Sequence, residues 1–252
     1  MATGRTHSRF SRVYIDGYDM SGYSRSWGTL SCTFEEGIDD ALNYNVKAVM
    51  PGMANVSMGP LNGLFDNTAT SGLHVIMNGA GALRNVMVPI GIRAVPADND
   101  PVFAGQFIQG AYQGGNENPV TATIPLNNAD YLSSNLQYVR PWGALLHASA
   151  AETAANSDTG LDQAAQTTAG GWMMYQVFAG DGNAAIKVQD ADTNLDGSFG
   201  DLLTSGNIDC SSPTSGVISL ASTATVERYV RWQVALDTAT TVTFALSFHR
   251  GN

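Results

Sequence analysis

The sequence predicts a mainly β protein made of antiparallel strands, with one short helix. The first observation is strict alternation of apolar and polar residues in several segments, the period expected of half-buried strands. In residues 241–248 the apolar positions are Val242, Phe244, Leu246 and Phe248. The second is composition: 27 of the 252 residues are glycine and only 13% are charged, which favours a turn-rich β fold over long charged helices.

The C-terminal third, residues 171–252, reads as a small β-sandwich domain. Residues 172–179 and 184–190 alternate around a Gly- and Asn-containing turn, which predicts a hairpin. Residues 228–236 and 241–248 predict a second strand pair. The 22 acids and 12 bases of the chain place more negative charge here: residues 141–252 carry 11 acids and 4 bases, against 11 and 8 in residues 1–140.

Residues 1–140 are predicted to form a first β domain. Strands are expected at residues 10–16, 28–35, 53–58, 84–95, 102–113 and 120–126. The best helix candidate is residues 70–78, with Thr70 or Ser71 as its cap and Gly79 after its end. Residues 35–42 read as a charged loop that leads into a short helical turn, which Pro51 stops. Residues 1–8 are expected to be a mobile arm that orders only against a partner.

Residues 141–170 are interpreted as a linker between the two domains. Most of this stretch, from residue 148 on, consists of Ala, Thr, Gln, Ser and Asp with few large apolar side chains. Such a composition cannot bury enough surface to hold its own fold. Trp142, at the upstream edge, is expected to pack on the first domain.

The net charge of −10 argues against a protein that grips DNA, because binding to phosphates requires clustered Lys and Arg. It does not argue against a wall past which DNA slides. Cys32 and Cys210 are far apart and outside any metal or redox motif, so buried thiols are favoured over a disulfide. No signal peptide is recognised, and no run approaches the roughly 18 apolar residues of a membrane helix, so we expect no membrane insertion.

Motifs for catalysis are missing from the sequence, so we expect neither an enzyme nor a bound cofactor. One stretch is similar to half of a calcium loop: Asp192, Asn194, Asp196 and Gly197 have its spacing. The twelfth position of that loop is Leu203 rather than the required acid. Asp, Asn and Gly are also what an inter-strand turn selects, so a turn is the favoured interpretation and no metal is expected.

Two sets of segments resemble the major tail proteins of long-tailed bacteriophages. Residues 12–23, 61–67 and 87–92 resemble their tube-forming domain, and residues 172–190, 228–231 and 242–250 resemble their C-terminal module. Together these segments span most of the chain. The resemblance implies a tail-tube-like β-barrel or sandwich domain in residues 1–140, and a β-sandwich decoration on the outside of the tube in residues 171–252.

The function that this resemblance implies is that of a virion structural protein, the tail tube subunit. Proteins similar to this one close into rings, usually of six subunits, which stack into a tube through which phage DNA passes without specific binding. The implied partners are other copies of the chain and the terminator, tape measure and distal tail proteins. The implied location is the virion tail, after synthesis in the cytoplasm of the bacterial host.

Two groups of charged residues are candidates for the contacts of such a tube. The basic group, expected at a subunit interface, is Arg5, Arg9 and Arg12. The acidic group, expected to face the lumen or the ring contact, is Asp16, Asp19, Glu35, Glu36, Asp39 and Asp40. An acidic bore would keep the genome from sticking. The alternative for residues 35–40 is a solvated loop with its acids near a helix start.

Other classes of protein remain open at this point. One is a capsid decoration or head-associated protein, and another is a cell-surface module that binds glycans. For glycan contact by the C-terminal domain, the aromatic residues that would have to be exposed are Tyr175, Tyr229 and Trp232. Most aromatic side chains of so small a domain are needed for its core.

Overall fold

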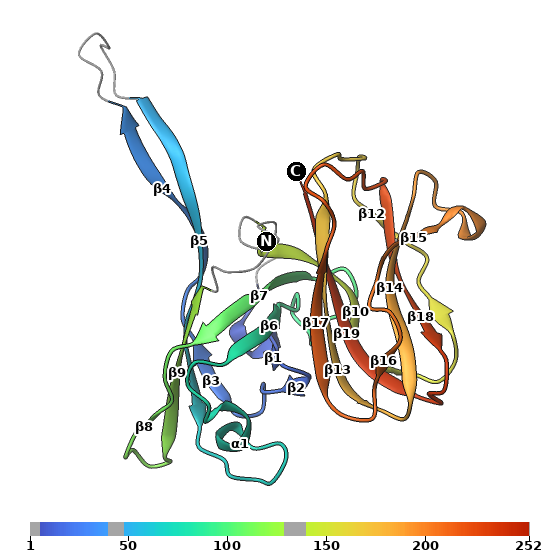
Figure 1. Cartoon of the computed structure of the whole chain (residues 1–252). Coiled ribbons are helices and arrows are strands. Elements are labelled where there is room, and N and C mark those ends of the chain that lie inside the picture. Colours follow the sequence, from blue (N-terminus) through green and yellow to red (C-terminus); the bar gives the residue numbers. More distant parts are fainter. Residues whose placement is uncertain (1–5, 40–47, 129–139, 252) are drawn as a thin grey trace.

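The structure, a computed structural model, describes residues 6–39, 48–128 and 140–251. Within these residues the chain is mainly β, as predicted, with a curled sheet of thirteen strands and a second, smaller sheet of six (Figure 1). The described helices are α1 (Leu73–Met77) and two 3-10 turns, η1 (Ser8–Phe10) and η2 (Asp196–Ser198).

The thirteen-stranded sheet contains β1 (Tyr14–Ile15), β2 (Tyr18–Asp19), β3 (Ser24–Trp27), β4 (Leu30–Asp39), β5 (Ala48–Leu64), β6 (Leu83–Pro89), β7 (Pro101–Gln109), β8 (Gln113–Gly114), β9 (Thr121–Asn128), β10 (Trp142–Glu152), β13 (Gly171–Gly180), β17 (Thr214–Ser219) and β19 (Val242–Arg250). The six-stranded sheet contains β11 (Asn156–Ser157), β12 (Leu161–Asp162), β14 (Asn183–Ala191), β15 (Gly200–Thr204), β16 (Ile208–Asp209) and β18 (Tyr229–Leu236).

A long hairpin of β4 and β5 projects from the first part of the chain (Figure 1). The predicted loop and helical turn are wrong for the described residues 35–39, because the β4–β5 pairing continues from Leu30 opposite Met58 to Asp39 opposite Ala48. Pro51 lies inside β5 rather than stopping a helix. Cross-strand pairing thus overrides the local charge pattern. Residues 40–42 of the predicted loop lie outside the described residues.

The helix α1 is shorter than predicted. It begins at Leu73, with Gly72 as N-cap and no side-chain cap. Thr70, a predicted cap, instead has a left-handed backbone with φ of 69°. Leu73 and Met77 are fully buried in a core with Phe103, Phe107 and Ile124 among its members. The apolar spacing therefore predicted the helix, while the cap was misplaced.

The strands that follow the helix end earlier than the alternation indicates. The predicted strand at residues 84–95 ends at Pro89 in β6, and that at residues 102–113 ends at Gln109 in β7. Proline lacks the N–H that a ladder needs, which is why it is confined to strand ends and edges. The two strands pair antiparallel along their length, from Leu83 opposite Ile108 to Pro89 opposite Val102.

Residues 141–170 are not an unpaired linker, which corrects the prediction for this stretch. Residues 142–152 form β10, which pairs with β7 on one side and with β19 on the other. The short strands β11 and β12 then pair with β18 of the second sheet. Small polar residues suffice here because neighbouring strands supply both hydrogen bonds and apolar contacts. The division into two domains stays a prediction.

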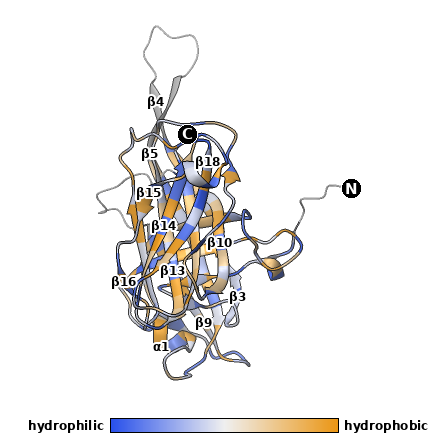
Figure 2. Cartoon of the chain, turned by 90° about the vertical axis from the view of Figure 1, so that its right-hand side faces the viewer, coloured by the Kyte–Doolittle hydropathy of each residue, from blue (hydrophilic) through white to orange (hydrophobic). Residues whose placement is uncertain are grey.

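The last part of the chain forms two facing layers around a core. Strands β13 and β19 of the large sheet face β14 and β18 of the small one, and the buried core between them includes Val177, Ile186, Trp232, Val234 and Phe244. Alternation is clear in β14, whose residues are by turns buried and partly exposed along most of its length. Figure 2, coloured by hydropathy, shows both hydrophobic and hydrophilic residues along the strands of this part of the chain. The predicted hairpin of residues 172–190 is wrong as a pairing: the two strands and the turn between them are present, but β13 and β14 lie in different sheets and do not pair. The predicted pair of residues 228–236 and 241–248 is wrong for the same reason, since β18 and β19 also lie in different sheets.

A buried polar side chain joins the first part of the chain to the last. Gln176, fully buried on β13, accepts a hydrogen bond from the N–H of Gly17 at 2.6 Å and donates one to the carbonyl of Asn85 at 3.0 Å. Gly17 has φ of 84°, and a Cβ there would lie 2.5 Å from the amide nitrogen of Thr214. Only glycine therefore fits this close approach.

Two further sequence predictions concern the membrane and the cysteines. Among the described residues, no helix has the length and apolar character needed to span a bilayer. Cys32 and Cys210 are not joined by a disulfide, and burial raises the pKa of both thiols.

Candidate functional site

A cleft of about 530 Å³ opens between residues 7–13 and residues 21–27. We call it the arginine cleft, because its lining includes Arg9, Arg12 and Arg25, along with His7, Val13, Trp27 and five serines. No carboxylate is among the lining residues. In a chain with a net charge of −10, a cleft lined only by cationic and neutral groups is the most distinctive polar feature of the described surface.

The first wall of the cleft is held in place by backbone contacts. The turn η1 is followed by a bridge between Ser11 and Ile90, and the N–H of Gly91 donates to the carbonyl of Phe10 at 3.1 Å. Arg9 lies over the Phe10 ring at 4.5 Å, and Arg12 donates to the carbonyl of Ser11 at 3.1 Å. Residues 7 and 8 of the predicted mobile arm are thus part of this wall.

The opposite wall comes from β3 and the turn before it. The N–H of Ser24 donates to the carbonyl of Met20 at 3.0 Å, which fixes the turn. β3 then pairs with β5, with Trp27 opposite Leu61. Arg25 is exposed, and Trp27 is half-buried against the core.

The cleft favours an anionic partner. Arg9, Arg12 and Arg25 form no ion pair with any described residue, whereas Arg84, Lys187, Arg228 and Arg231 each do. Like charges held close together destabilise each other until an opposite charge approaches. Guanidinium groups are also well suited to carboxylates and phosphates, which they bind by two parallel hydrogen bonds.

The structure brings together two of the three basic residues predicted for an interface. Arg9 and Arg12 both line the arginine cleft, and Arg5 lies outside the described residues. Arg25 was missed in the sequence. Its only signal was a further arginine in a serine-rich segment, and the turn that folds β3 back toward residues 9–12 was not evident.

The predicted acidic residues fall into separate places. Asp16 is engaged within the fold: its carboxylate lies 3.0 Å from Arg84 Nη1 and accepts from the N–H of Asn85 at 2.8 Å. Asp19 is exposed and accepts from the N–H of Ser21 at 2.9 Å. The pKa of Tyr14 is raised mainly by burial of its hydroxyl group, and the negative charge of Asp19 is the second cause. Both residues therefore have structural contacts, and their place relative to a lumen stays a prediction.

The remaining predicted acids belong to the projecting hairpin. Glu35 is exposed and lies at a shift in the β4–β5 register: Phe34 pairs with Ala54 and Glu36 with Pro51, so two residues of β5 stand opposite Glu35 and the bulge is on β5. Phe34 beside it is 49% exposed, a large value for an aromatic side chain. Asp39 ends β4, and Asp40 lies outside the described residues. A bulge bends the strand that carries it, so the hairpin departs from a regular ribbon opposite Glu35.

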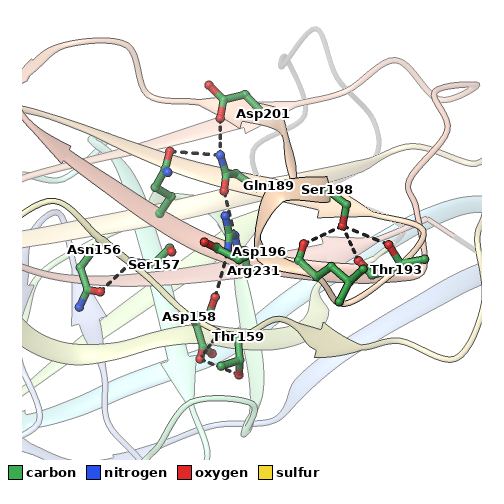
Figure 3. Close-up of polar contacts among 12 residues, drawn as sticks. Asn156, Ser157, Asp158, Thr159, Gln189, Thr193, Asp196, Ser198, Asp201 and Arg231 are labelled. Carbon is green, nitrogen blue, oxygen red and sulfur yellow. Dashed lines mark hydrogen bonds and ion pairs between the residues drawn. The ribbon is translucent and has the colours of Figure 1, made fainter.

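A second polar pocket, of about 580 Å³, lies on the outer face of the six-stranded sheet (Figure 3). At its floor is Arg231, whose side chain is only 6% exposed. Arg231 donates to Asp196 Oδ1 at 2.5 Å and to Gln189 Oε1 at 2.9 Å, and it covers the Phe199 ring at 4.2 Å. Gln189 in turn donates to Asp201 at 2.7 Å.

This network accounts for the stretch that is similar to half of a calcium loop. Asp196 begins η2 and forms an ion pair with Arg231, so one of the three predicted oxygen ligands is engaged by a guanidinium group. Among the described residues, no group of three or more His, Cys, Asp or Glu is arranged to hold a metal ion. The contacts tie the loop around η2 to the sheet, as an inter-strand turn requires.

The predicted glycan-binding aromatics do not form an exposed face. Tyr175 is 8% exposed and Trp232 is 5% exposed, and both belong to the core between the two layers. Their apolar rings contribute more by burial in so thin a sandwich than they would at its surface. Trp142, expected to pack on the first part of the chain, contacts the Phe103 ring edge-on at 5.2 Å but stays 46% exposed.

Comparison with known proteins does not show a family for this chain. No protein-family model matches the chain, and no curated protein matches it either. Among solved structures, the chain is similar to the Dit protein (gp 19.1) of phage SPP1, described as a paradigm of the hub adsorption apparatus in phages that infect Gram-positive bacteria. That match has a TM-score of 0.34 and 10% identity, and it covers 94% of this chain and 98% of the Dit chain. A likeness of this size does not establish a shared fold.

Proposed function

We propose that this chain is a virion structural protein of a long-tailed bacteriophage, and specifically the subunit that forms its tail tube. The observation that carries the proposal is the β4–β5 hairpin, which extends beyond the body of the protein (Figure 1). Among the described residues, β4 pairs only with β5. An isolated two-stranded ribbon is marginally stable in water and leaves hydrogen-bonding groups on its outer edges.

The free N–H and C=O groups on those edges are best paired by strands from other copies of the chain. Strands from neighbouring subunits that pair side by side close into a shared barrel, which removes exposed edges altogether. The resemblance of residues 12–23, 61–67 and 87–92 to tube-forming domains supports this arrangement. The same resemblance supports rings of six subunits, with residues 171–252 on the outside of the tube.

The charge of the chain agrees with a conduit for DNA. A net charge of −10 gives passing phosphates few cations to bind, so the genome would move along the wall without adhering to it. The acids of β4 beyond Glu35, which are Glu36 and Asp39, are the first candidates to line the bore. The terminator, tape measure and distal tail proteins are the partners that such a tube requires at its ends and in its lumen.

Electron microscopy of the purified protein tests the proposal directly. We expect tubes with a central channel, or rings at low protein concentration, and two-dimensional class averages of end-on views give the symmetry. A protein that remains monomeric and attaches only to preformed phage heads would overturn the proposal and favour a head decoration protein. A monomer that binds only glycans would equally overturn it.

A further inference from the structure

The projecting hairpin and the arginine cleft are complementary in chemistry. We infer that the part of the hairpin at the bulge opposite Glu35, with Phe34 and Glu35 on the β4 side, is seated in the arginine cleft of a second copy; we call this part the bulge. The inference rests on the proposed function, since it names the contact through which subunits would assemble.

The bulge carries an aromatic ring beside a carboxylate. Phe34 is 49% exposed and Glu35 is exposed next to it, at the register shift of β4. Glu35 forms no ion pair with any described residue of its own chain. Because the extra residue is on β5, the side chains of Phe34 and Glu35 point to opposite faces of the hairpin, so a cleft that takes this edge would meet the ring on one wall and the carboxylate on the other. Aromatic side chains are enriched at interface cores.

The cleft has the matching groups. Arg9, Arg12 and Arg25 supply guanidinium donors for a carboxylate, and Trp27 supplies an apolar surface for a ring. Five serines complete the lining without adding a competing negative charge. A carboxylate that enters the cleft would offset the repulsion among the three arginines, so the contact gains both from direct attraction and from reduced repulsion.

The contact must be made between copies, because the register of β5 keeps the two surfaces of one chain apart. Ser24, beside Arg25, pairs with Gly63, whereas Phe34 pairs with Ala54. The extended strand between these two partners on β5 corresponds to about 30 Å. A glutamate side chain cannot span that distance, so Glu35 reaches an arginine cleft only on another molecule.

A contact between two different surfaces has a consequence for assembly. Each copy offers one bulge and one cleft, so the interaction is head-to-tail and leaves a bulge and a cleft unused at the ends of every open oligomer. Such contacts produce closed rings when the rotation between copies closes, and open filaments when it does not. Both outcomes are compatible with a tube of stacked rings.

Charge reversal with mixing tests the inference. Glu35→Lys and Arg25→Glu, each alone, are expected to raise the critical concentration for assembly about tenfold or more, measured by sedimentation and electron microscopy. An equimolar mixture of the two variants should recover assembly. In alternating copies, the unchanged bulge of one variant meets the unchanged cleft of the other, and the two substituted positions meet with opposite charges.

The double variant, with both substitutions on one chain, should recover assembly in part, because the positive charge introduced at each bulge then meets the negative charge introduced at position 25, while Arg9 and Arg12 stay in the cleft. If a single variant fails to fold, neither the mixture nor the double variant should restore assembly. Failure of both the mixture and the double variant, with each protein shown to be folded by circular dichroism, would overturn the contact.

Matched variants separate the contact from general surface effects. Glu117→Lys changes an exposed glutamate outside both surfaces and should leave assembly unchanged. Phe34→Ser should weaken assembly, whereas Leu195→Ser, at a residue that is 67% exposed, should not.

The outcomes distinguish the two proposals. If the wild type forms tubes and both charge reversals assemble normally, the contact is overturned while the proposed function stands. If only Arg25→Glu impairs assembly, the contact is also overturned, since the cleft then meets a group other than Glu35. A wild-type protein that never assembles overturns the contact together with the function.

Discussion

The first and last parts of the chain differ in how they deal with their positive charges. In the last part, Lys187, Arg228 and Arg231 each form an ion pair with an aspartate of the same region. In the first part, the three arginines of the arginine cleft form none with any described residue. The same contrast holds for aromatic residues, since Phe244 is fully buried and Phe34 is 49% exposed. These cations of the last part are paired within their own region, whereas the arginine cleft and Phe34 of the first part are available to a partner.

The largest expected effect on stability comes from a comparison of two phenylalanines. Phe244→Ala should lower the free energy of unfolding by about 3–5 kcal/mol, because it removes a fully buried ring from the core between the two layers. Phe34→Ala should change it by less than about 1 kcal/mol. Urea unfolding followed by tryptophan fluorescence measures both. A comparable loss for the two variants would mean that Phe34 belongs to a core rather than to an interface.

A second variant tests the junction between the two parts. Gln176→Leu should lower the free energy of unfolding by about 1–3 kcal/mol, because it leaves the N–H of Gly17 without its acceptor in a buried place and removes one of the two hydrogen bonds that the carbonyl of Asn85 accepts. Gln113→Leu, at an exposed position of β8, is a control that leaves this junction intact. Loss of fluorescence cooperativity in Gln176→Leu alone would show that the two parts depend on this side chain to unfold together. An unchanged stability would contradict its role at the junction.

The pH dependence of stability tests a buried histidine of the last part. His249 is fully buried and stacked on Trp172 at 3.8 Å, and burial lowers its pKa from 6.5 to about 3. The unfolded chain therefore takes up a proton between pH 6.5 and pH 3 that the folded chain does not. This contribution to stability is fully present above the unfolded pKa and is lost as pH falls toward the folded one, by about 1.4 kcal/mol per pH unit at most.

The measurement is urea unfolding between about pH 7 and pH 4 for the wild type and for His249→Phe, a range that lies mostly between the two pKa values. The variant keeps a ring against Trp172 and should show a shallower fall in stability than the wild type over this range. Equal slopes for the two proteins would show that His249 is already protonated in the fold.

The smallest expected effect concerns a surface ion pair of the last part. Lys187→Gln should change the free energy of unfolding by about 0–1 kcal/mol, because its pair with Asp201 is partly exposed to solvent and is screened by salt. Thermal unfolding at low and high ionic strength measures the difference. A larger effect would place the side chain in a structural network with Gln189 rather than in a simple surface pair.

Much of the β architecture was predictable from the sequence, because alternation in segments such as residues 241–248 is a local signal. The helix was predictable for the same reason. The hairpin was not, since the charges of residues 35–40 indicate a loop when considered alone. The strand structure of the described residues 35–39 depends on pairing with residues of β5 from Ala48 onward.

The candidate site was predictable only in part. Arg9 and Arg12 stood out by number and spacing, but Arg25 joins them only because a turn folds β3 back toward η1. The burial of Tyr175 and Trp232 likewise depends on which face of each strand meets the other layer, and this is a tertiary property. Composition alone misled for residues 142–152, where partners elsewhere in the chain supply what the segment lacks.

The strand β10 has a mechanical consequence. It is bonded along one edge to β7 and along the other to β19, so the ladder passes from the first part of the chain to the last without an intervening flexible joint. Any bending between these parts has to stretch or break backbone hydrogen bonds. A torque applied to one end of the molecule would therefore be felt at the other, and a particle built from such units would resist twisting as a stiff rod does.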